Sequence, residues 1–138
     1  MKWALNFLGG FLVASATWAF GKIDDLIYAL LFFLIADWIT GMTAAWMNGE
    51  LSSKEGRRGI TKKVGTLFLV IVVYQADKIV PDIAGWEAPL RDVTISALIV
   101  NDFISVIENL GKWGVPIPEV IKKRLEQLHH LHEKGGHL

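Results

Sequence analysis

The feature that most constrains this chain is a long apolar segment interrupted by a single acid. Leu26–Ala36 is apolar, Asp37 follows, and Trp38–Met47 continues without a charge. The segment is long enough to cross a bilayer as a helix. A carboxylate at that depth costs about 2.5–3.5 kcal/mol, and each large apolar neighbour returns about 0.3–0.6 kcal/mol. The segment can therefore insert, but Asp37 needs water or a polar partner, which makes it a candidate functional residue.

The composition agrees with a membrane protein. The chain has 138 residues, of which 52% are hydrophobic, and its 14 basic residues balance its 14 acidic ones. This apolar content is too high for an ordinary soluble domain of the same size, and the balanced charge gives no indication of a nucleic-acid partner. The chain has no cysteine, which excludes disulfides and thiolate chemistry.

Catalysis receives little support from the sequence. We find no phosphate-binding loop, nucleophile elbow or zinc-protease motif, and we therefore predict no enzyme, no cofactor and no metal site. An intramembrane aspartyl pair is the one catalytic alternative, formed by Asp37 with Asp77 or Asp102. The C-terminal histidines are interpreted as a solvated tail, because no acidic or thiol ligands accompany them: His129, His130, His132 and His137.

Four apolar segments predict an all-α membrane protein with three to four transmembrane helices. The segments are Trp3–Phe20, about Leu26–Met47, Val64–Val80 and about Val93–Leu110. Pro81 ends the third segment, because proline cannot continue a helix. From Glu119 the spacing of apolar residues predicts a short amphipathic C-terminal helix. We therefore expect a transmembrane domain, residues 1–111, and a cytoplasmic basic, His-rich tail, residues 112–138.

Two of these segments allow alternatives. The fourth has a polar stripe, so it either spans the membrane and lines a water-filled space or lies flat in the interface. The first resembles a cleavable signal, with Lys2 before an apolar stretch and Ala14-Ser15-Ala16 after it; the alternative is a retained helix. A retained helix would present small residues on which another helix can pack, and the second segment has a weaker face of this kind. The residues of the two faces are Gly10, Ala14, Thr17 and Gly21, and Gly41 and Ala45.

Basic residues predict the orientation in the membrane. The connection Glu50–Lys63 is interpreted as a loop, and both this loop and the tail from Lys112 are rich in cations. The positive-inside rule places both in the cytoplasm, which gives four spans with both termini inside. We interpret the cations of the loop as topology determinants and contacts for anionic lipid, with a partner-docking loop as the alternative. They are Lys54, Arg57, Arg58, Lys62 and Lys63.

Polar residues within the membrane segments are further candidates for function. We single out Asp37, Asp77, Asn101, Asp102 and Glu108. Our hypothesis is that the first four form a polar surface that is buried between helices in one state and faces water in another. The structural alternative for Asp37 is a hydrogen bond to a neighbouring helix, at Asn101 or Ser105.

Several pieces of the sequence occur in a characteristic order between Leu26 and Leu128. They are Asp37-Trp-Ile-Thr-Gly41, Ala44-Ala45, Leu51–Val64, Asp77, Ile107–Gly111 and Gly114–Pro118 before a basic tail. Together they resemble the toxin-secretion/phage-lysis holin family (bacteriophage holin family 4). Each piece alone is weak, whereas the ordered set is fairly specific.

The resemblance implies a small phage-encoded protein of the bacterial inner membrane that oligomerises into lesions at a set time. The lesions release a cell-wall-degrading endolysin, or large toxins in some clostridia, without a required contact between holin and endolysin. An antagonist of a holin can share the same features. The resemblance also implies about three spans, where we count four segments. The alternatives from other classes are a small ion channel or transporter and a scaffold subunit of a membrane complex.

Overall fold

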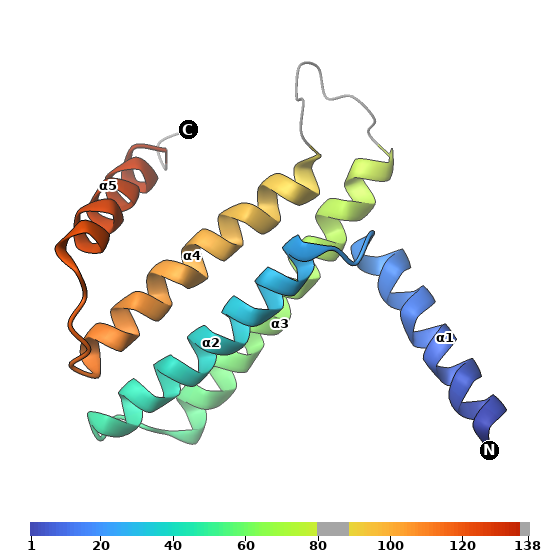
Figure 1. The fold of residues 1–138 in the computed structure, drawn as a ribbon, viewed down its shortest axis with the longest axis horizontal. Coiled ribbons are helices and arrows are strands. Elements are labelled where there is room, and N and C mark those ends of the chain that lie inside the picture. The colour runs from blue at the N-terminus through green and yellow to red at the C-terminus, as the bar shows by residue number, and fades with distance from the viewer. Residues whose placement is uncertain (80–88, 136–138) are drawn as a thin grey trace.

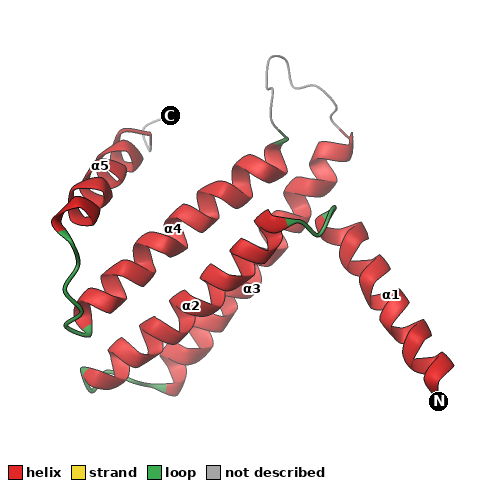
Figure 2. Cartoon of the chain, viewed as in Figure 1, coloured by secondary structure: helices red, strands yellow, loops and turns green. Residues whose placement is uncertain are grey.

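The chain folds into helices joined by short connections. The computed structural model describes residues 1–79 and 89–135, except for the side chains of residues 128, 129 and 131–135. The helices are α1 (Lys2–Phe20), α2 (Asp25–Met47), α3 (Ser53–Ile79), α4 (Leu90–Lys112) and α5 (Glu119–Gly135) (Figures 1 and 2). The first four are long and apolar enough to cross a membrane. The predicted fold class is therefore confirmed, with four candidate spans rather than three. Pro81 lies outside the described residues.

The start of α3 corrects the sequence analysis. Residues 53–63 are helical, so the predicted loop is limited to the short connection before Ser53. Ser52 begins the helix: its Oγ accepts a hydrogen bond from the Glu55 amide at 3.2 Å, and its carbonyl accepts one from Gly56. Lys, Arg and Glu are good helix formers, so the loss of hydropathy before Val64 marks the end of an apolar surface and not the end of a helix.

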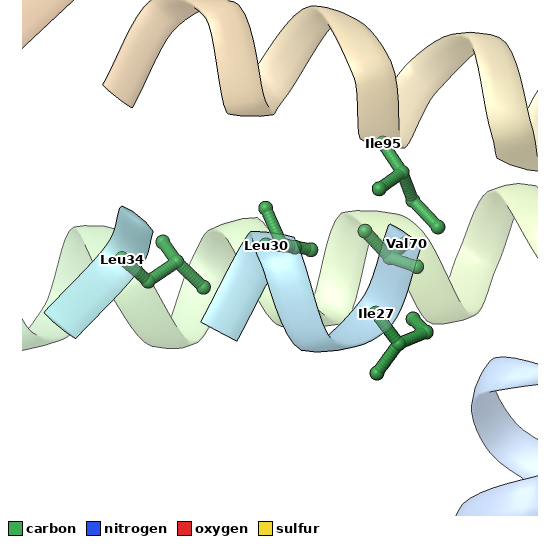
Figure 3. Packing of buried hydrophobic residues seen from close by; sticks show 5 residues of the cluster. All are labelled: Ile27, Leu30, Leu34, Val70 and Ile95. Carbon is green, nitrogen blue, oxygen red and sulfur yellow. The ribbon is translucent and has the colours of Figure 1, made fainter. Parts of the chain in front are cut away.

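The apolar core joins α2, α3 and α4 near the α1–α2 turn. α2 packs most extensively along α4, and α3 runs in the opposite direction beside them (Figure 1). The buried cluster consists of Ile27, Leu30 and Leu34 from α2, Val70 from α3 and Ile95 from α4 (Figure 3). Because lipid tails are as apolar as these side chains, close van der Waals packing rather than exclusion from water is expected to hold the helices together here.

α1 diverges from this group of helices (Figure 1). It contributes no buried residue to the described part of the chain. Its end is attached to α3, where the Gln75 side-chain amide donates to the Trp18 carbonyl at 3.0 Å and the Lys78 ammonium donates to the same oxygen at 3.3 Å. α1 therefore has one fixed end and a long exposed apolar surface.

The small-residue face expected on α1 is used only at its end. Gly21 is buried with φ 79°, and a Cβ there would lie 2.7 Å from Tyr74 Cε2. A Cβ on Gly10 would meet nothing within 4 Å in the described chain, and Ala14 and Thr17 are exposed. Packing of these three residues on another helix stays a prediction.

Candidate functional site: an ion triad at the inner end of a polar cleft

The candidate site is an ion triad of Asp37, Lys63 and Asp102, one residue from each of α2, α3 and α4. The Lys63 ammonium lies 2.5 Å from Asp37 Oδ2 and 2.9 Å from Asp102 Oδ1. At 1.5 Å per residue, Asp37 and Asp102 each lie about 18 Å from the beginning of their helices, and about 15 Å from the ends. The triad therefore joins three helices near the middle of their lengths.

Further hydrogen bonds continue the triad along α2 and α4. The Asn109 side-chain amide donates to Asp37 Oδ1 at 3.3 Å and to Thr40 Oγ1 at 3.2 Å. The Trp113 indole N–H donates to the Thr40 carbonyl at 3.2 Å. Gly41 leaves room for the Asn109 side chain beside α2, because a Cβ on Gly41 would already lie 3.4 Å from Asn109 Nδ2. The interhelical hydrogen bond expected for Asp37 is present, but its partner on α4 is Asn109 rather than Asn101 or Ser105.

The triad sets one ammonium against two carboxylates. The Asp102 side chain is 8% exposed, and within the described part of the chain its Oδ2 atom accepts no hydrogen bond. An ionised group in a low-dielectric setting is stable only while it is paired and hydrogen-bonded. Lys63 therefore compensates both carboxylates, and its side chain links α3 to α2 and α4 at this level.

A polar cleft of about 730 Å³ extends from the triad towards the α2–α3 turn. α3 and α4 supply its polar walls, including Asn101 and Ser105, and α2 supplies Gly41 and Ala45. Beyond the triad, in the other direction, lies the apolar core around Leu30, Val70 and Ile95. The cleft can admit water and ions as far as the triad, and the core closes the path beyond it.

Two of the predicted polar residues lie outside this cleft. Asp77 is at the opposite end of α3, where its carboxylate accepts hydrogen bonds from the amides of Leu90 at 3.2 Å and Arg91 at 2.8 Å. It therefore caps the N-terminus of α4, where a negative charge is favourable. Glu108 is exposed and does not line the cleft. The structure thus brings Asp37, Asn101 and Asp102 together, but not Asp77.

A second charged cluster fastens the α1–α2 turn to α4. The Arg91 guanidinium donates to the carbonyls of Phe20 and Lys22, both at 2.7 Å, and to the carboxylates of Asp24 and Asp92. Arg91 is 5% exposed. Its hydrogen bonds to Asp24 are the main cause that holds the pKa of that carboxyl below its ordinary value. This cluster fixes the turn in which Gly21 packs on Tyr74.

The cations of the predicted basic loop divide into one paired residue and four exposed ones, and the histidines of the tail form no described site. Lys63 belongs to the triad, whereas Lys54, Arg57, Arg58 and Lys62 are exposed on the first turns of α3. The side chain of His130 is exposed, and those of His129, His132 and His137 lie outside the described structure. Among the residues that the structure describes, no group of three or more His, Cys, Asp or Glu is placed to hold a metal ion.

Sequence reasoning missed the roles of Lys63 and Arg91. Lys63 was assigned to a loop, although Ser52 and Glu55 have the S/T-x-x-E spacing of a helix start, which would have extended α3 through Lys63. Arg91 stands between Pro89 and an apolar segment, and its partner Asp24 is 67 residues away in the chain. No local pattern predicts that contact.

Comparison with known proteins gives a consistent picture. The sequence model of the bacteriophage holin family matches residues 14–130. A probable holin of Bacillus phage phi105 is 35% identical over 80% of this chain and 78% of its own length. An uncharacterized protein of Listeria monocytogenes is 41% identical over 75% of this chain and 71% of its own length. An uncharacterized 14.9 kDa protein of Clostridium perfringens is 36% identical over 94% of this chain and 93% of its own length. No solved structure matches this chain.

Proposed function

This chain belongs to the bacteriophage holin family, and we propose that it acts as a holin in the cytoplasmic membrane of a bacterial host. It oligomerises there and opens lesions at a set time, through which an endolysin, or a large toxin, leaves the cytoplasm. The action is non-enzymatic and needs no cofactor. The observation that carries the proposal is the ion triad at the inner end of a polar cleft, within helices whose other surfaces suit lipid.

The triad supports two states of the helices. In the closed state Lys63 compensates Asp37 and Asp102, and α3 stays attached to α2 and α4. If α3 separates from them, each charge loses its partner, and only water can replace it at reasonable cost inside a bilayer. Separation therefore favours an assembly in which these side chains face an aqueous opening. Further copies of the chain supply the rest of its wall, with α1 as a packing surface.

The membrane potential is the proposed trigger. Moving one elementary charge across the membrane is worth about 2.3 kcal/mol per 100 mV. The charges of the triad lie part-way across the helices, so a change in potential acts on them directly. Many copies in one array add these small energies, and a fall in potential then releases the closed state of the whole array.

The distribution of charge supports an orientation with both termini in the cytoplasm. The exposed cations at the beginning of α3 and the end of α4, from which the basic tail leaves, lie at one end of the candidate spans, and the positive-inside rule assigns that end to the cytoplasm. Residues 1–111 form the membrane domain in this proposal, and residues 112–138 form a cytoplasmic tail that contains α5.

Induced expression together with a cytoplasmic endolysin tests the proposal. Culture turbidity is expected to fall suddenly after a delay, only when both proteins are present, and an uncoupler is expected to bring the fall forward. Each protein expressed alone is the control. Slow inhibition of growth with an energised membrane, and no release of the endolysin, would contradict the holin role.

A passage for small ions is a second candidate, favoured by a cleft that leads from one end of the helices to an ion triad. Saturable flux of one ion without release of protein supports this candidate. Escape of a folded cytoplasmic enzyme supports the holin.

A further inference from the structure

The first three turns of α3 carry a cationic stripe, which we define as Lys54, Arg57, Arg58 and Lys62. All four side chains are exposed. Within residues 1–79 and 89–135, none of them takes part in an ion pair, whereas the neighbouring Lys63 is paired with two aspartates. The stripe is therefore a concentration of positive charge that the chain itself leaves uncompensated.

Local electrostatics make this part of α3 receptive to an anion. Lys54 and Arg58, and Arg58 and Lys62, are four residues apart, so each pair of like charges lies on one face and repels. The beginning of a helix is also the positive end of its dipole, where cations are unfavourable and anions are favourable. Glu55 is the one acid in the first turn. An anion on the stripe would relieve both effects.

Apolar residues beside the stripe indicate where that anion comes from. Leu51, Ile60 and Val64 are exposed, as is Trp46 at the end of α2. Side chains of this kind are stable at the boundary between acyl chains and headgroups, while Lys and Arg extend from the same helix towards the phosphates. A soluble acidic protein would leave this apolar surface uncovered, whereas a membrane leaflet covers both parts at once.

We propose that the cationic stripe is a binding surface for anionic phospholipid headgroups. Arg58 and Lys62, one helical turn apart, hold one phosphate between them. Arg57 shares a face of α3 with Ile60 and Val64, three and seven residues further on, so it binds a phosphate where these two side chains contact the acyl chains. Clusters of basic residues next to membrane helices bind anionic lipid in this way. Arg58 and Lys62 also line the polar cleft, so a bound headgroup lies at its wall.

Binding of lipid to the full chain in detergent micelles tests this inference. Phosphatidylglycerol and phosphatidylcholine with identical acyl chains are titrated, and bound lipid is counted by native mass spectrometry. The stripe variant R57Q/R58Q/K62Q is compared with K122Q/K123Q/R124Q, which removes the same charge from α5. We expect the wild type to prefer phosphatidylglycerol, and the stripe variant to bind it at least about tenfold more weakly, because each basic residue contributes severalfold. The α5 variant is expected to stay within about threefold of the wild type.

Three further measurements separate loss of lipid binding from loss of the fold. Circular dichroism reports whether the stripe variant keeps its helices, and R57K/R58K is expected to keep the lipid preference, because it keeps the charge. Binding by the wild type is also expected to weaken as salt rises, since exposed charges are screened. Equal loss in both triple variants, equal binding of the two lipids, or binding that is independent of salt would overturn the proposal. These measurements do not involve lysis, so their outcome is separate from that of the holin role.

Discussion

The Lys63 ammonium lies 2.9 Å from Asp102 Oδ1, although the two residues are 39 positions apart in the chain. The same ammonium contacts Asp37, so one flexible side chain bridges two carboxylates that face each other from α2 and α4. Like charges brought together in a low-dielectric site are unfavourable without such a bridge. One positive charge therefore links three helices that the apolar core also packs together.

Replacement of Lys63 by Met is expected to lower the free energy of unfolding by about 3 kcal/mol, because it leaves two partly buried carboxylates without a counter-charge. Unfolding of the full chain in detergent, followed by circular dichroism, measures the loss. Lys63→Arg is the matched control and should recover most of the stability. A Lys63→Met variant as stable as the wild type would show that the triad does not hold the helices together.

Replacement of Asp37 by Leu is expected to delay lysis or abolish it. The variant leaves Lys63 and Asp102 as a balanced pair, so separation of α3 no longer uncovers a second carboxylate that needs water. The lysis time of cells with a co-expressed endolysin is the measurement. Glu126→Gln, an exposed change on α5, is the control for altered charge. Lysis of the Asp37→Leu strain at the wild-type time would remove Asp37 from the proposed mechanism.

Gly21→Ala should destabilise the fold by about 1–3 kcal/mol, since φ 79° and ψ −150° suit glycine alone. The added methyl group would also meet the Tyr74 ring. Gly10→Ala offers a comparison within the same helix, because its Cβ meets nothing within 4 Å in the described chain, and it should not lower the stability of the isolated protein. Thermal unfolding at low protein-to-detergent ratio compares the two variants. Equal effects would mean that the α1–α2 turn is not held as described.

Stability should depend on pH through Asp24. The pKa of this carboxyl is lower in the folded chain than its ordinary value of 3.8, chiefly because Arg91 hydrogen-bonds to the charged form. The folded state therefore binds fewer protons in this range, and the stabilisation is fully present above pH 3.8 and is lost as the pH falls through the folded pKa. Unfolding midpoints measured at a series of acidic pH values test this. Asp24→Asn should remove this part of the pH dependence, and an unchanged profile in that variant would contradict it.

The sequence was sufficient to predict the apolar part of each span, because hydropathy identifies a long apolar run directly. It also indicated that Asp37 needs a polar partner and that Asp102 belongs to the same polar surface. It did not indicate that Lys63 is the partner of these carboxylates. The charges around Lys63 interrupt the apolar pattern, and such an interruption predicts a loop. The role of Arg91 could not be predicted for a different reason. Its role depends on carbonyls of the turn at Phe20 and Lys22, and such contacts are set by packing rather than by spacing.

The position of the polar cleft also affects the electrical thickness of the membrane around this protein. When water fills the cleft, the solution at its open end reaches electrically as far as Lys63, and the remaining insulating layer is the one that contains Leu30, Val70 and Ile95. The full transmembrane voltage then falls across roughly half of the hydrocarbon thickness of about 30 Å, so the field there is about twice as strong. The protein thus concentrates the electric field in the apolar layer directly beyond its own ion triad.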